Sequence, residues 1–306
     1  MKKLLTIFFF LTSLISWEQT VSDIDGNIYN TVTIGTQTWT KENLKTTKYS
    51  NGVPIQYVAV DTIWGGLTIP AFCTYNNDTA YRQEYGNLYN FYAILDSRNV
   101  CPTGWHVPSN IEWNLLIAYL GGESIAGGKM KETGFTHWQT PNTGADNSSG
   151  LTVIPAGYRY SNNGFNHGGF HGLNGNGAIW TSTSSSDSTS IAKYFYPGSA
   201  SVGLLDIMNS YGISIRCVSD ASADINENEK LNGINVFPNP TNYLLTIPID
   251  GQKNIFITNM QGQIIKTIKT ESQAISLADL PTGNYIVSVF SNSNKLLMTN
   301  QIIITK

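Results

Sequence analysis

The clearest helical pattern in the chain covers residues 109–121. Ser109 and Glu112 have the S-x-x-E spacing of a capping box, in which each side chain accepts a hydrogen bond from the backbone N–H of the other residue. Apolar residues then follow the i, i+3, i+4, i+7 spacing of one helix face, and they are Trp113, Leu116, Ile117 and Leu120. A helix is therefore predicted here, and Glu112 is interpreted as its cap and not as a catalytic acid.

Elsewhere the apolar pattern favours strands. A second helix is predicted only at residues 87–95, where several apolar side chains share one face. After residue 234, runs of Ile, Val, Leu and Thr alternate with turn residues such as Asp250-Gly251. Six strands are predicted there, at residues 234–237, 243–249, 254–258, 263–269, 285–290 and 295–304. About 70 residues of this pattern predict a small all-β sandwich.

The pattern also divides the chain into segments. Two lysines precede an apolar stretch that is too short to span a bilayer, so residues 1–16 are interpreted as a signal peptide. Residues 220–234 are polar and acidic and lack an apolar period, which predicts an exposed linker. Domains are predicted at residues 25–219 and 235–306. No segment after the signal peptide has the length and apolar character of a transmembrane span.

Composition separates the same two domains and narrows the class of protein. All Trp, His, Arg and Cys residues come before residue 218. Charged residues make up 13% of the chain, about half of the roughly 25% that is usual for soluble proteins. Together with many Gly and Asn residues, this is typical of a β-rich, loop-rich protein and not of an ordinary cytosolic enzyme. The net charge of −3 and the absence of a basic run argue against nucleic acid as a partner.

Several motifs before residue 219 resemble a known family. They include YGNLYNFYA at residues 85–93, CPTGWHVPS at residues 101–109 and YGISIRCV at residues 211–218. Their order and spacing resemble the Fibrobacter succinogenes major paralogous domain over roughly residues 25–219. That family is similar to C-type-lectin-like and formylglycine-generating-enzyme-like proteins. The resemblance implies an α+β C-type-lectin-like domain with few helices and long loops, and a disulfide between Cys101 and Cys217.

The C-terminal domain carries a second resemblance. VFPNP at residues 236–240, ITNMQG at residues 257–262 and LADLPTGNY at residues 277–285 resemble a type A sorting domain of the type IX secretion system. The resemblance implies that residues 235–306 interact with the type IX machinery. It also implies that the protein is secreted or held at the outer-membrane surface.

Candidate ligand-binding residues gather in and beside the Gly-rich stretch 157–177. A sugar ring can stack on exposed aromatic side chains while His and Asn bind its hydroxyl groups. The candidates are Tyr158, Tyr160, Phe165, His167, His171 and Trp180. The alternative, that most of these aromatic side chains pack in the core or in loops, stays open.

Signals for catalysis and for cofactors are weak. The chain has no nucleophile elbow, P-loop, Rossmann fingerprint or zinc-protease motif. Formylglycine-generating enzymes use a close cysteine pair to bind copper, whereas Cys73 is in a different segment from Cys101 and Cys217. No cofactor is predicted. Calcium stays an alternative, because Asp146, Asn147 and Asp206 offer oxygen ligands.

These observations predict a secreted or cell-surface, non-catalytic binding or adhesion protein. Its lectin-like domain is expected to contact a glycan or the extracellular matrix. Two alternatives remain. One is an enzyme on the same scaffold, either a polysaccharide hydrolase or an oxidase, and the other is a structural surface-layer component.

Overall fold

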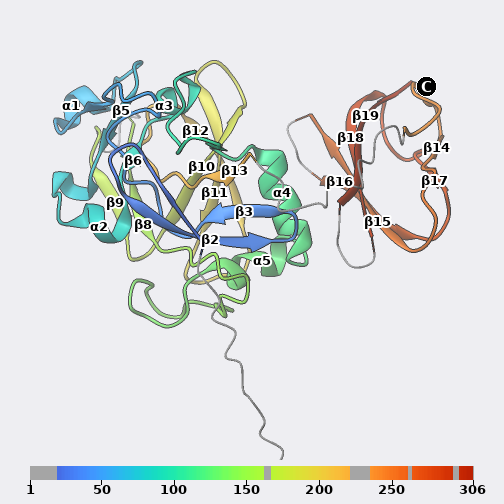
Figure 1. The fold of residues 1–306 in the computed structure, drawn as a ribbon, viewed down its shortest axis with the longest axis horizontal. Helices are drawn as coiled ribbons and strands as arrows, with labels where there is room; N and C mark the ends of the chain where they lie inside the picture. The colour runs from blue at the N-terminus through green and yellow to red at the C-terminus, as the bar shows by residue number, and fades with distance from the viewer. Residues whose placement is uncertain (1–18, 162–166, 221–234, 261–263, 292–295, 306) are drawn as a thin grey trace, which may run out of the picture.

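The computed structural model describes residues 19–161, 167–220, 235–260, 264–291 and 296–305. The predicted signal peptide lies outside these ranges, as do residues 221–234 of the predicted linker. The described residues form many strands and a few short helices, and each of the two parts of the chain has its own sheets (Figure 1). The β-rich, helix-poor class predicted from the sequence is confirmed.

The first sheet joins the beginning of the N-terminal part to its end. From edge to edge its strands are β1 (Thr20–Ser22), β2 (Ile28–Ile34), β3 (Gln37–Thr40), β13 (Val218–Ser219) and β7 (Trp105–His106). Val218 pairs antiparallel with Trp39 on one side and with His106 on the other. The last strand of this part is therefore held in the interior of the sheet, where both of its edges are bonded.

A second sheet carries most of the remaining strands of the N-terminal part. Its order is β12 (Gly203–Met208), β11 (Thr189–Phe195), β10 (Gly177–Ser184), β8 (Ala156–Arg159) and β9 (Phe170–Leu173). A smaller sheet consists of β4 (Gln56–Tyr57), β5 (Ala71–Cys73) and β6 (Leu88–Tyr89). Because the chain order differs from the spatial order, residues far apart in sequence become neighbours on one sheet face.

Residues 209–219, which we call the closing segment, connect these sheets. The backbone of the segment bonds in turn to β6, β10 and β3, through the pairs Ile213–Tyr89, Ser214–Trp180 and Cys217–Thr40. Burial of the segment is nearly complete from Gly212 to Val218. Its backbone groups are thus satisfied inside the domain, as buried peptide groups must be.

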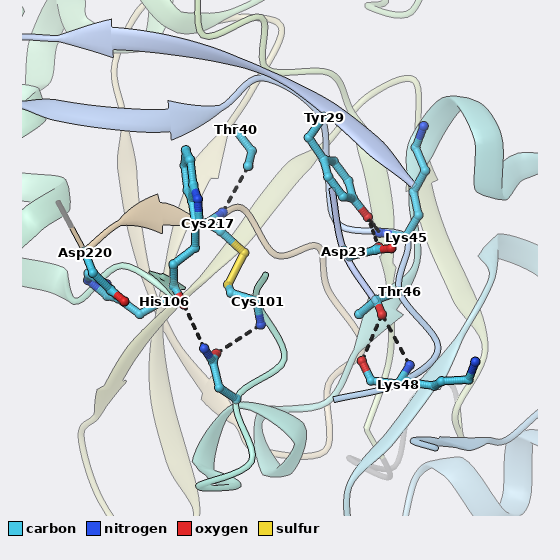
Figure 2. The surroundings of a disulfide bond; sticks show 12 residues. Asp23, Tyr29, Thr40, Lys45, Thr46, Lys48, Cys101, His106, Cys217 and Asp220 are labelled. Carbon is cyan, nitrogen blue, oxygen red and sulfur yellow. Dashed lines mark hydrogen bonds and ion pairs between the residues drawn. A yellow bond between two sulfur atoms is a disulfide. The ribbon is translucent and has the colours of Figure 1, made fainter. Parts of the chain in front are cut away.

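A disulfide fixes the end of the closing segment. Cys101 and Cys217 are bonded across 116 residues, with their Cα atoms 6.0 Å apart (Figure 2). The Cys217 N–H also donates to Thr40 Oγ1 at 3.0 Å. In the chain-entropy model a crosslink over a loop of about this length stabilises the fold by about 4 to 5 kcal/mol. The pairing implied by the family resemblance is present in the structure.

The third cysteine, Cys73, has no disulfide partner. It is fully buried on β5, and burial raises the pKa of its thiol to about 12. The thiol therefore stays protonated at neutral pH and packs as a small apolar side chain.

The predicted helix at residues 109–121 is α4 (Asn110–Tyr119). Its capping box has both hydrogen bonds, from Glu112 N to Ser109 Oγ at 3.2 Å and from Ser109 N to Glu112 Oε2 at 2.7 Å. The helix predicted at residues 87–95 begins later, as α3 (Phe91–Leu95). Asn90 is its N-cap, and the two residues before Asn90 belong to β6, where tertiary pairing overrides the apolar spacing.

Four further helical segments among the described residues were not predicted. Three are short: α1 (Asp61–Trp64), η1 (Tyr75–Asn77) and α2 (Tyr81–Tyr85). The longest is α5 (Glu123–Met130), whose Gly127 and Gly128 are poor helix formers. A Cβ atom at Gly127 would lie 2.3 Å from the carbonyl oxygen of Ser201, and one at Gly128 would lie 2.2 Å from that of Gly144. Close backbone packing therefore requires glycine at both positions.

The C-terminal part has two facing sheets. One pairs β14 (Leu244–Thr246) with β17 (Ala274–Ser276), and the other has the order β16 (Ile264–Thr270), β15 (Lys253–Asn259), β18 (Gly283–Ser291) and β19 (Leu296–Ile304). Side chains from both sheets meet in one buried core, which includes Leu245, Ile275, Ile257 and Val287. Five of the predicted strands have counterparts here. Of the run at 234–237, the described residues 235–237 contribute a bridge between Phe237 and Thr246 and no strand. The strand β17 was not predicted.

His106 links the capping box to Asp220, the residue directly after the closing segment. Its Nε2 lies 2.8 Å from Glu112 Oε1, and its Nδ1 lies 2.5 Å from Asp220 Oδ1. Figure 2 shows His106 and Asp220 close to the disulfide. The hydrogen bond to Glu112 raises the pKa of His106 to about 9, burial opposes this shift, and Asp220 adds to it. The imidazole is therefore positively charged at neutral pH and holds two carboxylates.

Replacing His106 with Gln should remove a pH-dependent part of the stability. Because the folded pKa lies above the unfolded value of about 6.5, the contribution is complete below that value and is lost as the pH rises through about 9. Urea unfolding of both proteins from about pH 6 to about pH 10 measures the difference in free energy of unfolding. The difference should shrink with rising pH, and a constant difference would contradict the assignment.

Candidate functional site

An open pocket lies on one face of the second sheet. It has a volume of about 350 Å³ and is lined by eight residues, which are Tyr158, Tyr160, Ala178, Tyr194, Leu205, Ile207, Tyr211 and Ile213. We call it the tyrosine pocket. The same sheet face packs elsewhere against the buried core around Phe91 and Trp180, while Tyr158, Tyr194, Leu205, Ile207 and Tyr211 are only partly buried at its margin. The pocket is therefore the part of an apolar face that the core does not cover.

Strand alternation explains which side chains reach the pocket. On β12 the side chains of Leu205 and Ile207 point to the partly buried face, while Leu204, Asp206 and Met208 are exposed. On β8, Tyr158 pairs directly opposite His171 of β9, and their rings lie 5.5 Å apart. Side chains at such opposite positions are neighbours on the sheet surface.

Three tyrosine rings form one wall of the pocket. The Tyr158 ring centre lies 5.2 Å from that of Tyr160 and 6.3 Å from that of Tyr211, and Tyr160 and Tyr211 are 5.8 Å apart. A reciprocal pair of backbone hydrogen bonds between Arg159 and Gly212, at 2.7 and 2.9 Å, aligns the two segments that carry these rings. The closing segment therefore supplies one ring, and the end of β8 supplies the other two.

The buried side chain of Arg159 supports the backbone that carries the rings of Tyr158 and Tyr160. Its guanidinium is fully buried between the rings of Trp64 and Phe170, each 4.6 Å from it. It donates hydrogen bonds to the carbonyl oxygens of Gly168, Val58 and Ala59, and to Asp61 Oδ1 at 2.7 Å. A buried charge is tolerated only when it is paired and hydrogen-bonded in this way. The arginine fixes the backbone between Tyr158 and Tyr160.

The pocket offers neutral hydroxyl groups. Burial raises the pKa of Tyr158, with a further contribution from the hydroxyl of Tyr160 at 3.4 Å, and burial also raises the pKa of Tyr194. The Tyr194 hydroxyl donates to Asn176 Oδ1 at 2.6 Å. These phenols therefore stay protonated at neutral pH. Among the described lining residues of the pocket there is no Asp, Glu, Lys or Arg.

The structure brings together three of the predicted ligand-binding residues, Tyr158, Tyr160 and His171. Phe165 lies outside the described residues. His167 is exposed just before β9 but does not line the tyrosine pocket.

Trp180 must be removed from the candidate set. Its side chain is completely buried on β10, its ring packs 5.2 Å from that of Phe91, and its Nε1 donates to the Tyr89 carbonyl oxygen at 2.8 Å. The alternative left open in the sequence, a packing role, holds for this residue.

Sequence reasoning missed Tyr194, Tyr211, Leu205 and Ile207. In β12, exposed and partly buried positions alternate, and this local pattern could have placed Leu205 and Ile207 on one face of a strand. Tyr211 was visible only as part of a family motif. Nothing local places these residues beside Tyr158, because their meeting depends on the strand order of the sheet.

The calcium alternative gains no support from the described residues. Asp146 Oδ1 accepts a hydrogen bond from Ser148 N at 2.8 Å, and Asp206 Oδ1 accepts one from Ser185 Oγ at 2.5 Å. No group of three or more His, Cys, Asp or Glu side chains suited to a metal ion occurs in the described ranges. The copper alternative requires two neighbouring thiols, whereas Cys101 and Cys217 are bonded to each other.

The architecture defines a β-rich protein with two parts, a disulfide-closed domain that carries an open tyrosine pocket and a C-terminal sandwich. Residues 32–219 match the Fibrobacter succinogenes major domain, and residues 235–305 match the secretion system C-terminal sorting domain. The chain belongs to the Fibrobacter succinogenes major domain family and carries a type IX sorting domain at its C-terminus.

Comparisons with curated proteins and with solved structures do not identify the function of the chain. No curated protein matches the chain significantly. A solved structure of PorZ, described as an essential bacterial surface component of the type-IX secretion system of Porphyromonas gingivalis, has 10% sequence identity and a TM-score of 0.22. The alignment covers 94% of this chain and 45% of that chain, so this chain spans less than half of the length of PorZ. A similarity at this level supports no inference about fold or function.

The sorting domain determines where the protein goes. It directs export by the type IX secretion system to the cell surface or the extracellular space and implies interaction with that machinery. Within the described residues, no helix has both the length and the apolar character of a membrane span.

Gly157, next to Tyr158, gives a test of the pocket framework. Its φ of +67° disfavours other residues, and a Cβ atom there would lie 2.6 Å from the His171 carbonyl oxygen. Gly26 has a similar φ of +82° but open space around it. Gly26→Ala should cost about 1 to 2 kcal/mol in free energy of unfolding, since only the backbone is strained, and Gly157→Ala should cost clearly more. Urea unfolding measures both, and equal losses would contradict the close packing of β8 on β9.

Proposed function

We propose that the protein is an exported, non-catalytic binding protein that holds a glycan of the cell surface or of the extracellular matrix in its tyrosine pocket. The observation that carries this proposal is the pocket itself, an uncovered apolar face with three clustered tyrosine rings in an exported protein. Adhesion follows if the sorting domain leaves the protein attached at the surface. We further propose that binding requires no metal ion or other cofactor.

The chemistry of the pocket suits a sugar. A pyranose ring presents C–H groups on its faces and hydroxyl groups at its edge, and aromatic rings with polar tips match both features. The volume of about 350 Å³ falls within the range of small-molecule sites, roughly 300 to 1,000 Å³. The protonated phenols can both donate hydrogen bonds to sugar hydroxyls and accept them.

The same lining favours binding over the alternative functions. A glycoside hydrolase needs two carboxyl groups flanking the bond that is cleaved, and the described residues that line the tyrosine pocket include none. A purely structural surface-layer component has no use for an open pocket with clustered aromatic rings. We therefore favour a binding function over an enzyme on the same scaffold and over a structural surface-layer component.

For the fold of residues 25–219 we propose a branch of the C-type-lectin-like fold. Support comes from three features of the structure. The first and last strands share one sheet, a capped helix follows β7, and a disulfide joins the segment before that helix to the last strand.

Truncation of a pocket tyrosine tests the binding function. Tyr160→Ala removes a ring that contacts both Tyr158 and Tyr211, so glycan affinity should fall at least tenfold, as is usual for a central aromatic contact. Tyr243→Ala in the C-terminal part is the matched control, because Tyr243 is 55% exposed and far from the pocket in sequence. Binding is measured on a glycan array with and without a calcium chelator, and circular dichroism verifies folding.

The control variant should bind like the parent protein, and the chelator should have no effect. Equal binding by Tyr160→Ala and the parent would contradict the placement of the site. Absence of any glycan ligand for the parent protein would contradict the proposed function as a whole.

Deletion of residues 235–306 tests the export route. Without the sorting domain the protein should remain in the periplasm, because the type IX machinery then has nothing to recognise. Cell fractionation with immunodetection of the N-terminal part measures this. Unchanged delivery to the surface or medium would contradict a sorting role for the domain.

A further inference from the structure

A second depression lies beside the tyrosine pocket. It has a volume of about 410 Å³, and we call it the polar groove. Gln139, His171, Asn176 and Tyr196 are among its lining residues, and no Asp, Glu, Lys or Arg belongs to its described lining. The groove therefore shares the neutral character of the pocket but is richer in hydrogen-bonding groups.

Two side chains stand at the boundary between the two depressions. His171 lines the polar groove, and its ring lies 5.5 Å from the Tyr158 ring and 5.9 Å from the Tyr160 ring of the tyrosine pocket. Asn176 also lines the groove, and its Oδ1 accepts the hydrogen bond from the Tyr194 hydroxyl in the pocket. The two depressions thus share a wall built from an imidazole and an amide.

The backbone holds the amide of Asn176 in position. Gly172 has a φ of +78°, and a Cβ atom there would lie 2.3 Å from Asn176 Nδ2. The Asn176 N–H donates to the Gly172 carbonyl oxygen at 2.7 Å. The turn between β9 and β10 is therefore shaped so that the amide lies against Gly172 and reaches Tyr194.

The groove has an aromatic platform of its own. Tyr196 is 51% exposed, and a Cβ atom at Gly198 would lie only 2.7 Å from the Tyr196 ring, so the ring rests on the backbone of this turn. Tyr194 is near the end of β11, and Tyr196 directly follows the last residue of that strand, Phe195. In an extended chain, side chains two residues apart lie on one face about 7 Å apart. One of them lines the pocket and the other lines the groove.

We propose that the tyrosine pocket and the polar groove are two adjoining subsites for one ligand, a neutral oligosaccharide at least two sugar units long. This inference rests on the proposed glycan-binding function and extends it. One ring stacks in the tyrosine pocket, and the next lies against Tyr196. His171 and Asn176 bind hydroxyl groups near the bond between the two units. Because neither Lys nor Arg belongs to the described lining of the two subsites, neutral sugars should bind better than sugar acids.

Oligosaccharide length series test the inference on the full chain. The probes are neutral cello-, xylo-, manno- and laminari-oligosaccharides from the monosaccharide to the hexasaccharide, and titration calorimetry gives each Kd. In the series that binds, affinity should rise at least tenfold from the monosaccharide to the trisaccharide, since a second subsite becomes occupied. A uronic-acid oligomer of equal length should bind more weakly than the neutral one.

Substitutions separate the two subsites. Tyr196→Ala should lower the affinity for the trisaccharide and longer chains by about tenfold or more, so that affinity no longer rises with chain length. Its affinity for the monosaccharide should stay unchanged, because the Tyr196 ring lines the groove alone. Asn176→Ala should also reduce the gain with chain length, and because its amide accepts the hydrogen bond from Tyr194 it should weaken the monosaccharide as well. Tyr160→Ala should weaken every chain length, whereas the control Tyr243→Ala should weaken none.

The other outcomes distinguish failure of the second subsite from failure of the proposed function. If affinity does not depend on length, or if Tyr196→Ala binds all lengths like the parent while Tyr160→Ala does not, the second subsite is refuted and the proposed function stands. If Tyr160→Ala also binds like the parent, the ligand is not held in the tyrosine pocket, and the inference fails with the placement of the site. If no neutral series binds while another glycan binds on the array, the inference alone is refuted. If no glycan binds at all, the proposed function fails together with the inference.

Discussion

Closure of the N-terminal domain by its own last residues is the constraint on which the rest of the structure depends. The closing segment bonds to β6, β10 and β3 in succession, and the Cys101–Cys217 disulfide locks its end. A domain with few helices, many glycines and long loops cannot rely on local hydrogen bonds alone. The disulfide lies where the sheets meet and spans 116 residues. Such a crosslink lowers the conformational entropy of the unfolded chain and thereby stabilises the folded domain.

The same segment connects closure to the candidate site. It begins near Tyr211, a wall of the tyrosine pocket, and ends at the disulfide. Between these points Gly212 bonds to Arg159, whose buried guanidinium fixes the backbone between Tyr158 and Tyr160. The residues that close the fold therefore also position the rings, so loss of closure is expected to disturb the pocket. A pre-formed site of this kind loses little conformational freedom when it binds.

Sequence reasoning was sufficient where the signal is local and failed where it depends on strand order. The capping box of α4 and the cluster of Tyr158, Tyr160 and His171 come from neighbouring or facing residues. The Cys101–Cys217 pair came from family resemblance and not from spacing. The missed tyrosines, Tyr194 and Tyr211, join the site only through the sheet order β12-β11-β10-β8-β9.

Two misjudged features have the same physical origin. Residues Gly177–Thr181 on β10 are all buried, so the strand has core on both faces. Trp180 therefore packs inside although its sequence surroundings are polar and Gly-rich. In α5 the glycines argue against a helix, yet tight backbone contacts require them. Tertiary packing overrides local propensity in both places.

We propose that this exported protein binds its ligand in the tyrosine pocket. Hydrogen-exchange mass spectrometry of the full chain, with and without a saturating neutral oligosaccharide identified on the array, tests this proposal. Exchange should become slower in β8, β9, β12 and residues 209–213, and it should stay unchanged in the C-terminal part. Protection confined to any other region would contradict the proposal.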